Sequence, residues 1–299
     1  MFAAGVRGLP CRTPGEWRNW QTRRLQVPVS ERMWGFKSPL AHRSRQVHVR
    51  AWMSWSSGKD SALALHRARE VLGLDVTRLL VSLNADAERI SMHAVRSELL
   101  ELQADRLGLP VHRVDLPAPC PNDVYEAAMH DAVRQARAEG AERVVFGDLF
   151  LANVRDYREQ HLAGTGLTPV FPLWGEPTDR LAREMLDAGV RAVLTCVDPT
   201  VLPASFAGRP FDADLLADLP QGVDPCGERG EFHTFVWDAP GFSAPIPVSV
   251  GEVVARDGFV FCDVLPASGV SSGMAPRRPS SAATPRAAST TSDGSAAAR

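Results

Sequence analysis

The segment Ser-Ser-Gly-Lys-Asp-Ser at residues 56–61 combines residue types that suit a phosphate-binding loop. Lys59 is one of only two lysines among the 33 Lys and Arg residues of the chain. An ammonium group is a compact point charge, whereas the planar fork of arginine is bulky for a loop of small residues. An apolar stretch ending at Trp55 precedes the loop and a helical pattern follows it, so backbone N–H groups and a helix N-terminus would face phosphate oxygens. A simpler interpretation, in which Ser57 or Asp60 caps the helix and Lys59 is solvated, remains open on these six residues.

A second group of candidate residues lies in the Gly-Glu-Arg-Gly-Glu-Phe-His-Thr segment at residues 227–234. Glu228, Glu231 and His233 place two carboxylates and an imidazole within six residues, beside two glycines that allow a close approach to a ligand. Carboxylates can hold an ammonium ion, and a carboxylate or a histidine can take up its proton. A structural role for His233, with its ring bonded to a backbone group, is an equally good interpretation.

Strands and helices alternate between these two segments. Apolar runs predict strands at residues 76–83, 111–114, 144–146, 168–173 and 192–197, and helical spacing predicts helices at 92–107, 123–137, 154–162 and 178–188. This alternation predicts an α/β fold with a parallel sheet covered on both faces. Ligands of such sheets bind beyond the carboxyl ends of the strands, where we expect the 56–61 loop, Asn84, Asp148 and Asp198.

The two ends of the chain differ from the rest. Residues 1–52 carry ten Lys and Arg against two Glu, with neither helical nor strand periodicity and no apolar core of a secretory signal. Residues 35–39 can be encoded by GGG-TTC-AAG-TCC-CCC, which contains the T-arm sequence of a transfer RNA. We therefore interpret residues 1–52 as a spurious extension translated from a tRNA-like sequence, with Met53 as the first true residue. Residues 267–299 have the composition of a disordered tail.

The composition of the remaining body excludes several classes of protein. Residues 53–266 hold 19 Lys and Arg against 32 Asp and Glu, a net charge of −13, which makes nucleic-acid binding unlikely. Its four cysteines form no C-x-x-C pair, which favours reduced thiols in the cytoplasm. No apolar stretch is long enough to span a membrane. We expect a larger domain, which contains the 56–61 loop, at residues 53–200 and a smaller domain at 201–266.

Taken together, the motifs of the body resemble those of the diphthine–ammonia ligase family, a branch of the PP-loop ATP pyrophosphatases. The matching segments, in the order of the family, are residues 56–61, 92–96, 145–148, 172–175 and 227–236. The loop departs from the usual Ser-Gly-Gly-Lys-Asp-Ser by having Ser57 in place of a glycine. The resemblance implies a HUP-like α/β domain followed by a smaller C-terminal domain. It also implies that ATP adenylates a carboxylate, that pyrophosphate leaves, and that ammonia converts the acyl-adenylate into an amide.

This resemblance implies a role for each candidate residue. The expected ligands of ATP are Ser56, Ser57, Gly58, Lys59, Asp60, Ser61, Asn84, Gly147 and Asp148. Asp60 would bind Mg²⁺ or cap the helix, and Lys59, Glu231 and His233 would be catalytic. Glu228 and the helical pair Arg155 and Arg158 would contact the substrate, although both arginines could instead be solvated.

Two other functions remain open from the sequence. A PP-loop enzyme that thiolates tRNA would need paired cysteines and a basic face. A nucleotide-binding protein without turnover would not need the 227–234 segment. The carboxylate itself, small or protein-borne, is open too, because the Arg-rich composition indicates a bacterial GC-rich genome, where diphthine is not expected.

Overall fold

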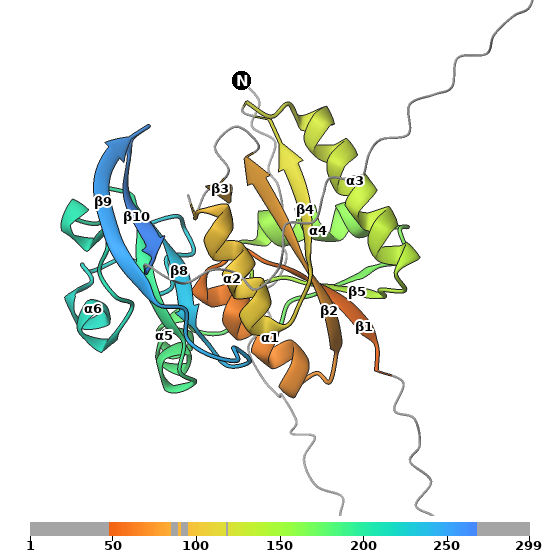
Figure 1. The fold of residues 1–299 in the computed structure, drawn as a ribbon, viewed down its shortest axis with the longest axis horizontal. Helices are drawn as coiled ribbons and strands as arrows, with labels where there is room; N and C mark the ends of the chain where they lie inside the picture. The colour runs from red at the N-terminus through yellow and green to blue at the C-terminus, as the bar shows by residue number, and fades with distance from the viewer. Residues whose placement is uncertain (1–47, 85–88, 91–94, 118, 268–299) are drawn as a thin grey trace, which may run out of the picture. The chain divides into compact units, whose positions relative to one another are not determined.

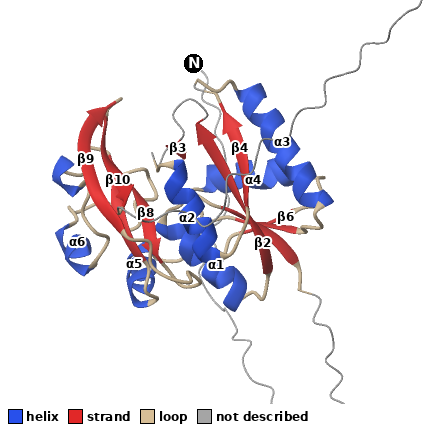
Figure 2. Cartoon of the chain, in the orientation of Figure 1, coloured by secondary structure: helices blue, strands red, loops and turns tan. Residues whose placement is uncertain are grey.

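The computed structural model describes residues 48–84, 89–90, 95–117 and 119–267 (Figures 1 and 2). Residues 1–47 of the predicted N-terminal extension and all but the first residue of the predicted tail lie outside these residues. Among the helices of the described part, none is long and apolar enough to cross a membrane.

The first lobe is built on a parallel sheet, as the sequence predicts. Its parallel strands follow the order β4-β2-β1-β5-β6, and the short β3 pairs antiparallel with the end of β2. The strands are β1 (Arg50–Ser54), β2 (Asp75–Asn84), β3 (Arg89–Ile90), β4 (Val111–Leu116), β5 (Arg143–Val145) and β6 (Thr168–Val170). The central strand β1 has β2 on one side and β5 on the other, so the chain reverses direction across the sheet at this strand.

Two pairs of helices cover the two faces of this sheet. Side chains of successive strand residues point to opposite faces, so Ala51 and Met53 join one core cluster and Trp52 joins the other. The first cluster contains residues of α1 (Lys59–Glu70) and α2 (Ser97–Leu107), and the second contains residues of α3 (Asn122–Ala138) and α4 (Ala152–Leu162). The fold is therefore an α/β sandwich with β1 at its centre.

The second lobe contains a smaller antiparallel sheet (Figure 2). Its strands follow the order β8-β7-β10-β9. They are β7 (Arg191–Val197), β8 (Phe232–Asp238), β9 (Val248–Arg256) and β10 (Phe259–Pro266), accompanied by α5 (Thr178–Asp187), the 3₁₀ turn η1 (Ala204–Phe206) and α6 (Ala213–Asp218). The first core cluster continues from α1 and α2 into this lobe, so the two lobes share one core.

The structure corrects three sequence predictions. The strand at 192–197 belongs to the antiparallel sheet, so Asp198 does not lie at the edge of the parallel one. The helix predicted from residue 92 begins at Ser97, after an extended Arg96, and residues 92–94 lie outside the described part. Finally, β1 begins at Arg50 and pairs with β2 from its first residue, so Met53 is not the start of the folded chain.

Candidate active site

A cavity of about 220 Å³ opens at the carboxyl ends of β1 and β5. This is the point at which the strand order reverses, where ligands of open α/β sheets bind. Both lobes contribute to its walls. The lining residues are Ser54, Ser56, Lys59, Asp60, Ser61, Phe146, Gly147, Asp148 and Arg158 of the first lobe, and Cys226, Gly227, Glu228, Phe232, His233 and Thr234 of the second.

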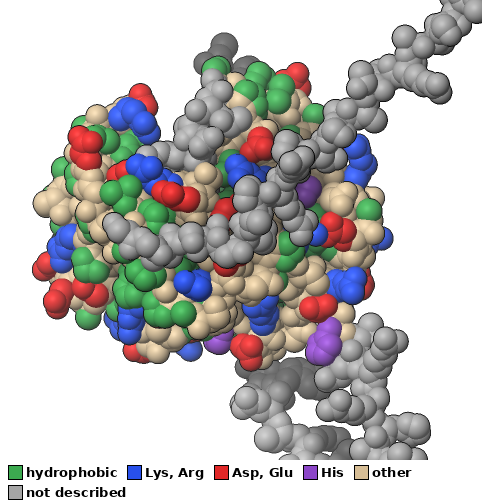
Figure 3. Space-filling view, in the orientation of Figure 1, with side chains coloured by type: hydrophobic (Ala, Val, Ile, Leu, Met, Phe, Trp, Pro, Cys, Tyr) green, Lys and Arg blue, Asp and Glu red, His purple; other side chains and the backbone are tan. Residues whose placement is uncertain are grey.

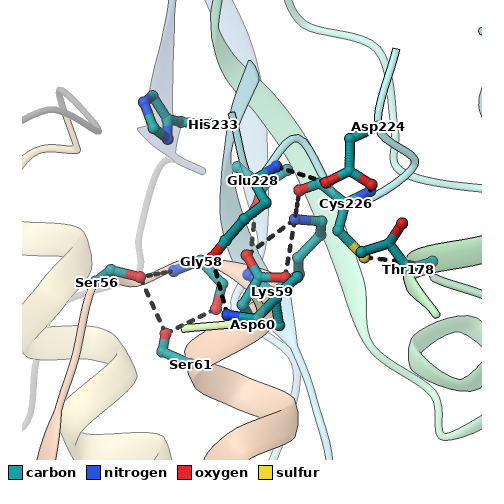
Figure 4. Close-up of polar contacts among 12 residues, drawn as sticks. Ser56, Gly58, Lys59, Asp60, Ser61, Thr178, Asp224, Cys226, Glu228 and His233 are labelled. Atoms are coloured by element: carbon teal, nitrogen blue, oxygen red, sulfur yellow. Dashed lines mark hydrogen bonds and ion pairs between the residues drawn. The ribbon is translucent and has the colours of Figure 1, made fainter. Parts of the chain in front are cut away.

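The 56–61 loop is a compact turn stabilised by its own serines (Figure 4). The amide of Gly58 donates to Ser56 Oγ at 3.3 Å, and Ser61 Oγ donates to the carbonyl of Gly58 at 2.8 Å. Ser57 adopts a positive φ of 66°, a region that glycine enters without strain. Ser57 is thus a serine in a backbone conformation that favours glycine.

The second lobe completes this loop through backbone and side-chain hydrogen bonds. The amide of Lys59 donates to Thr234 Oγ1 at 3.2 Å, and the amide of Val236 donates to the carbonyl of Ser57 at 2.9 Å. Fully buried Gln103 of α2 donates to the carbonyls of Ser57 at 3.2 Å and Val236 at 2.6 Å. Gln103 is not among the residues predicted from the sequence, where its signal is a polar residue on the apolar face of a predicted helix.

Lys59 is buried at the junction of the lobes, with 2% of its side chain exposed. Its Nζ donates to Asp60 at 2.9 and 3.1 Å and to the carbonyl of Cys226, and it lies 5.6 and 5.3 Å from the ring centres of Phe211 and Phe232. Burial, the largest single effect, disfavours the ammonium form, but the surrounding groups, with Asp60 first among them, together raise the pKa of Lys59. Lys59 is therefore a charged group that lines the cavity and is not solvated.

The loop after β5 closely approaches the 56–61 loop at Gly147. A Cβ on Gly147 would lie 3.0 Å from the amide nitrogen of Ser61 and 3.1 Å from the carbonyl carbon of Asp60, so only glycine fits without displacing backbone. Next to it, Asp148 and Arg158 face each other at 3.6 Å. Asp148 Oδ2 and Arg158 Nε are buried and have no hydrogen-bond partner within the described residues. These two atoms form a long ion pair with each other, and both residues line the cavity, where a polar ligand could bond to them.

Glu228 is a carboxyl group of the cavity wall with a raised pKa. Its Oε1 accepts a hydrogen bond from the amide of Leu149 at 2.8 Å, and its own amide donates to Asp224 at 2.9 Å (Figure 4). Burial raises its pKa to about 7, despite the hydrogen bond from Leu149. A carboxyl group of this kind can exchange protons near neutral pH.

His233 lies on β8 and also lines the cavity. Figure 4 shows its ring set apart from the group formed by Lys59, Asp60 and Glu228. Burial, with a smaller effect of the Lys59 charge, lowers its pKa to about 4. The ring is therefore neutral at neutral pH.

Glu231 is not brought to the cavity. Its Oε1 accepts from the amide of Asp224 at 3.1 Å and its Oε2 accepts from the amide of Arg229 at 2.9 Å. The side chain is buried, with 7% exposed, and it holds together the turn that presents Glu228. The structure therefore gives Glu231 a structural role where the sequence predicted a catalytic one.

Two further predicted residues also lie away from the lining. Asn84 ends β2, on the side of β1 opposite to β5, where the cavity does not extend. Arg155 donates to Glu159 at 2.7 Å, and its guanidinium lies 5.0 and 4.8 Å from the ring centres of Phe171 and Trp174. Of the two helical arginines, only Arg158 reaches the cavity.

The described residues include no cluster of three or more His, Cys, Asp or Glu side chains that could hold a metal ion by themselves. Mg²⁺ usually takes one or two carboxylates, with water and substrate phosphates completing its coordination. Asp60, at the first turn of α1 and in the cavity wall, fits such a shared site.

Comparison with known proteins agrees with this architecture. The chain matches the models of the diphthamide synthase N-terminal domain over residues 49–168 and of the diphthamide synthase C-terminal domain over residues 177–267. Diphthine–ammonia ligases of Bos taurus and Homo sapiens are 28% and 27% identical over 180 residues, which are 55% of this chain and 67% of each relative. A diphthine–ammonia ligase of Schizosaccharomyces pombe is 24% identical over 226 residues, 69% of this chain and 37% of that relative. Since the two models together span both lobes and every residue that lines the cavity, the chain belongs to the diphthamide synthase family.

Proposed function

We propose that this protein is an ATP-dependent ligase that adenylates a carboxylate, releases pyrophosphate and transfers ammonia to form an amide. The observation that carries the proposal is the 56–61 loop, which opens at the start of α1 into a cavity completed by the second lobe. Such a loop presents backbone amides to phosphate oxygens. The relatives named diphthine–ammonia ligases support the ligase activity.

Lys59 and the loop amides would act on the phosphates of ATP. Negative charge develops between the α- and β-phosphates as pyrophosphate leaves, and preorganised donors stabilise it. Lys59 now bonds to Asp60, and the oxygens of ATP would compete for the same ammonium hydrogens. A Mg²⁺ ion shared by Asp60 and the phosphates would neutralise further charge on the leaving group.

The acceptor side of the cavity would be formed by Arg158, Glu228 and His233. In the first step, an oxygen of the acceptor carboxylate attacks the α-phosphorus, and the bond to pyrophosphate breaks. In the second, ammonia attacks the carbonyl carbon, AMP leaves, and the excess proton passes from nitrogen to the carboxylate of Glu228. A pKa of about 7 suits Glu228 to this proton transfer at neutral pH. Arg158, which lines the cavity, would orient the acceptor carboxylate.

The composition of the body limits the choice of substrate. A net charge of −13 over residues 53–266 (19 Lys and Arg, 32 Asp and Glu) argues against a tRNA acceptor. The cysteines Cys120, Cys196, Cys226 and Cys262 are free thiols, as expected in the cytoplasm. The acceptor is thus diphthine or another small or protein-borne carboxylate.

The test is pyrophosphate release from ATP, with and without ammonium and a panel of carboxylates, for the natural chain and Lys59→Met. Methionine keeps the packing between Phe211 and Phe232 but removes the charge. We expect release to depend on a carboxylate and to fall at least tenfold in the variant. Arg183→Met, which removes a 65% exposed charge on α5, is the control and should change nothing.

Three outcomes would contradict the proposal. Absence of ATP binding by the natural chain would exclude it. ATP binding without pyrophosphate release for every carboxylate would indicate a nucleotide-binding protein without turnover. Full activity of Lys59→Met, or of Lys59→Arg, would show that Lys59 does not act on phosphate.

A further inference from the structure

Strand β9 forms an open edge of the second lobe. Within the described part of the chain it pairs with β10 alone, and Figure 1 shows it as the outermost strand of this sheet. An open edge presents unpaired backbone N–H and C=O groups, which natural proteins usually shield with charges, bulges or a partner. Val250, Val253 and Val254 on this edge are 54%, 48% and 39% exposed, so apolar side chains accompany these groups.

A β-bulge divides the strand and determines which side chains share a face. Val250 lies opposite Val264 and Val253 lies opposite Cys262, so two residues of β9 face the single Asp263. Val250 and Val253 are consequently on the same face as buried Cys262 and Val264. Beyond the bulge, over residues 252–256, successive side chains alternate regularly between the two faces of the sheet.

The inner face of β9 borders an apolar groove. The groove has a volume of about 390 Å³, and its walls include Trp237, Ile246, Val248, Val250 and Val264. In Figure 3, hydrophobic side chains are visible among charged ones in the part of the surface where Figure 1 places β9 and β10. An edge strand beside an apolar groove is suited to the addition of another strand.

The outer face carries charges of opposite sign at matched spacing. Glu252 and Arg256 lie two residues before and two residues after Val254. The guanidinium of Arg256 lies 4.9 Å from the ring centre of Phe261, which keeps it on this face. When two copies of this strand pair antiparallel with Val254 opposite Val254, each negative charge lies opposite a positive one.

We propose that a second copy of this chain pairs antiparallel with β9 about a two-fold axis at Val254. Glu252 then lies opposite the partner's Arg256, and this pair occurs twice. Val253 lies opposite the partner's Ala255 on the inner face of β9. A register centred on Glu252 would place like charges opposite each other, which destabilises cross-strand pairing. This inference does not depend on the proposed activity.

Charge exchange tests both the interface and its register. Sedimentation velocity should show the natural chain as a dimer that dissociates on dilution between about 100 and 1 µM, the range expected for a small interface. Glu252→Arg and Arg256→Glu should each raise the dissociation constant at least tenfold. An equimolar mixture of the two variants should regain the dimer, as should the chain carrying both changes, because opposite charges then meet again. Arg183→Glu on exposed α5 should have no effect.

Several results would overturn the proposal. The proposal is wrong if the natural chain remains monomeric at about 100 µM. This holds both for an open β9 and for a β9 that another segment of the chain covers. Single variants that still dimerise would place the interface elsewhere. Failure of the mixture to dimerise, with both variants folded by circular dichroism, would exclude the register centred on Val254.

Discussion

Burial moves the pKa values of two cavity residues, Glu228 and His233, in opposite directions. Glu228 holds its proton up to about pH 7 in the folded protein, whereas His233 loses its proton above about pH 4. Stability contributed by protonated Glu228 is complete below its ordinary pKa of 4.5 and is lost as the pH rises through 7. His233 acts oppositely, because the unfolded chain binds its proton below pH 6.5 and the folded chain does so only near pH 4.

We therefore predict that His233→Gln changes the pH dependence of stability. Between pH 6.5 and 4 the free energy of unfolding of the natural chain should fall relative to that of the variant, as the unfolded imidazole takes up a proton. The difference should reach at most about 3 kcal/mol. Urea unfolding at a series of pH values measures it, with Glu228→Gln as a matched variant whose difference has the opposite sign. Parallel curves for His233→Gln and the natural chain would show that the ring is not buried as described.

At the scale of elements, the turn between β1 and α1 contains a residue, Ser57, whose backbone and side chain are both in unfavourable environments. Ser57 has a positive φ of 66°, and its buried Oγ has no hydrogen-bond partner among the described residues. A left-handed conformation at a non-glycine residue destabilises the folded protein by about 1–2 kcal/mol. A buried hydroxyl without a hydrogen-bond partner destabilises it by about 1–3 kcal/mol. Glycine has a larger unfolded-state entropy, which opposes these gains by about 0.5–1 kcal/mol.

Ser57→Gly should accordingly stabilise the protein by about 1 kcal/mol, measured by chemical unfolding. Ser56→Gly is the control. It should destabilise the protein, because Ser56 Oγ accepts a hydrogen bond from the amide of Gly58. If Ser57→Gly instead lowers stability or ATP binding, the hydroxyl of Ser57 has a partner in solution and the strain is compensated.

Most helices and strands could be predicted from the sequence, but which strands pair and which side chains meet could not always be predicted. Apolar periodicity found the helices and the parallel strands of the first lobe, but not the short β3, since burial of one face is a local property of the chain. It could not assign β7, because an apolar run such as residues 192–197 is typical of a central strand in either kind of sheet. The motif at 227–234 was found as a whole. However, Glu228 and Glu231 have different roles because Gly227 and Gly230 turn the backbone with φ of 68° and 90°.

At the scale of the whole molecule, the first residues of β1 decide where a stable chain can begin. Ala51 and Trp52 are fully buried, and the Trp52 ring lies 5.4 Å from the guanidinium of Arg78 and 5.0 Å from the ring of His112. We predict that a chain beginning at Met53 is insoluble or much less stable, since loss of a buried tryptophan removes about 3–5 kcal/mol. A chain beginning at Val47 after an added methionine is the control and should melt like the full chain in calorimetry. Equal melting temperatures for both shortened chains would contradict this prediction.

The hydrogen bonds between β8 and the 56–61 loop limit how the two lobes can be exchanged between related proteins during evolution. Thr234 and Val236 of the second lobe satisfy backbone groups of the loop, and Phe211 and Phe232 enclose Lys59. The first lobe therefore does not form the complete cavity by itself. Recombination that joined it to the second lobe of a distant relative would alter the 56–61 loop together with the rest of the cavity wall. A change of ligand is accordingly expected to arise by substitution within the second lobe, with these contacts preserved, and not by exchange of the whole lobe.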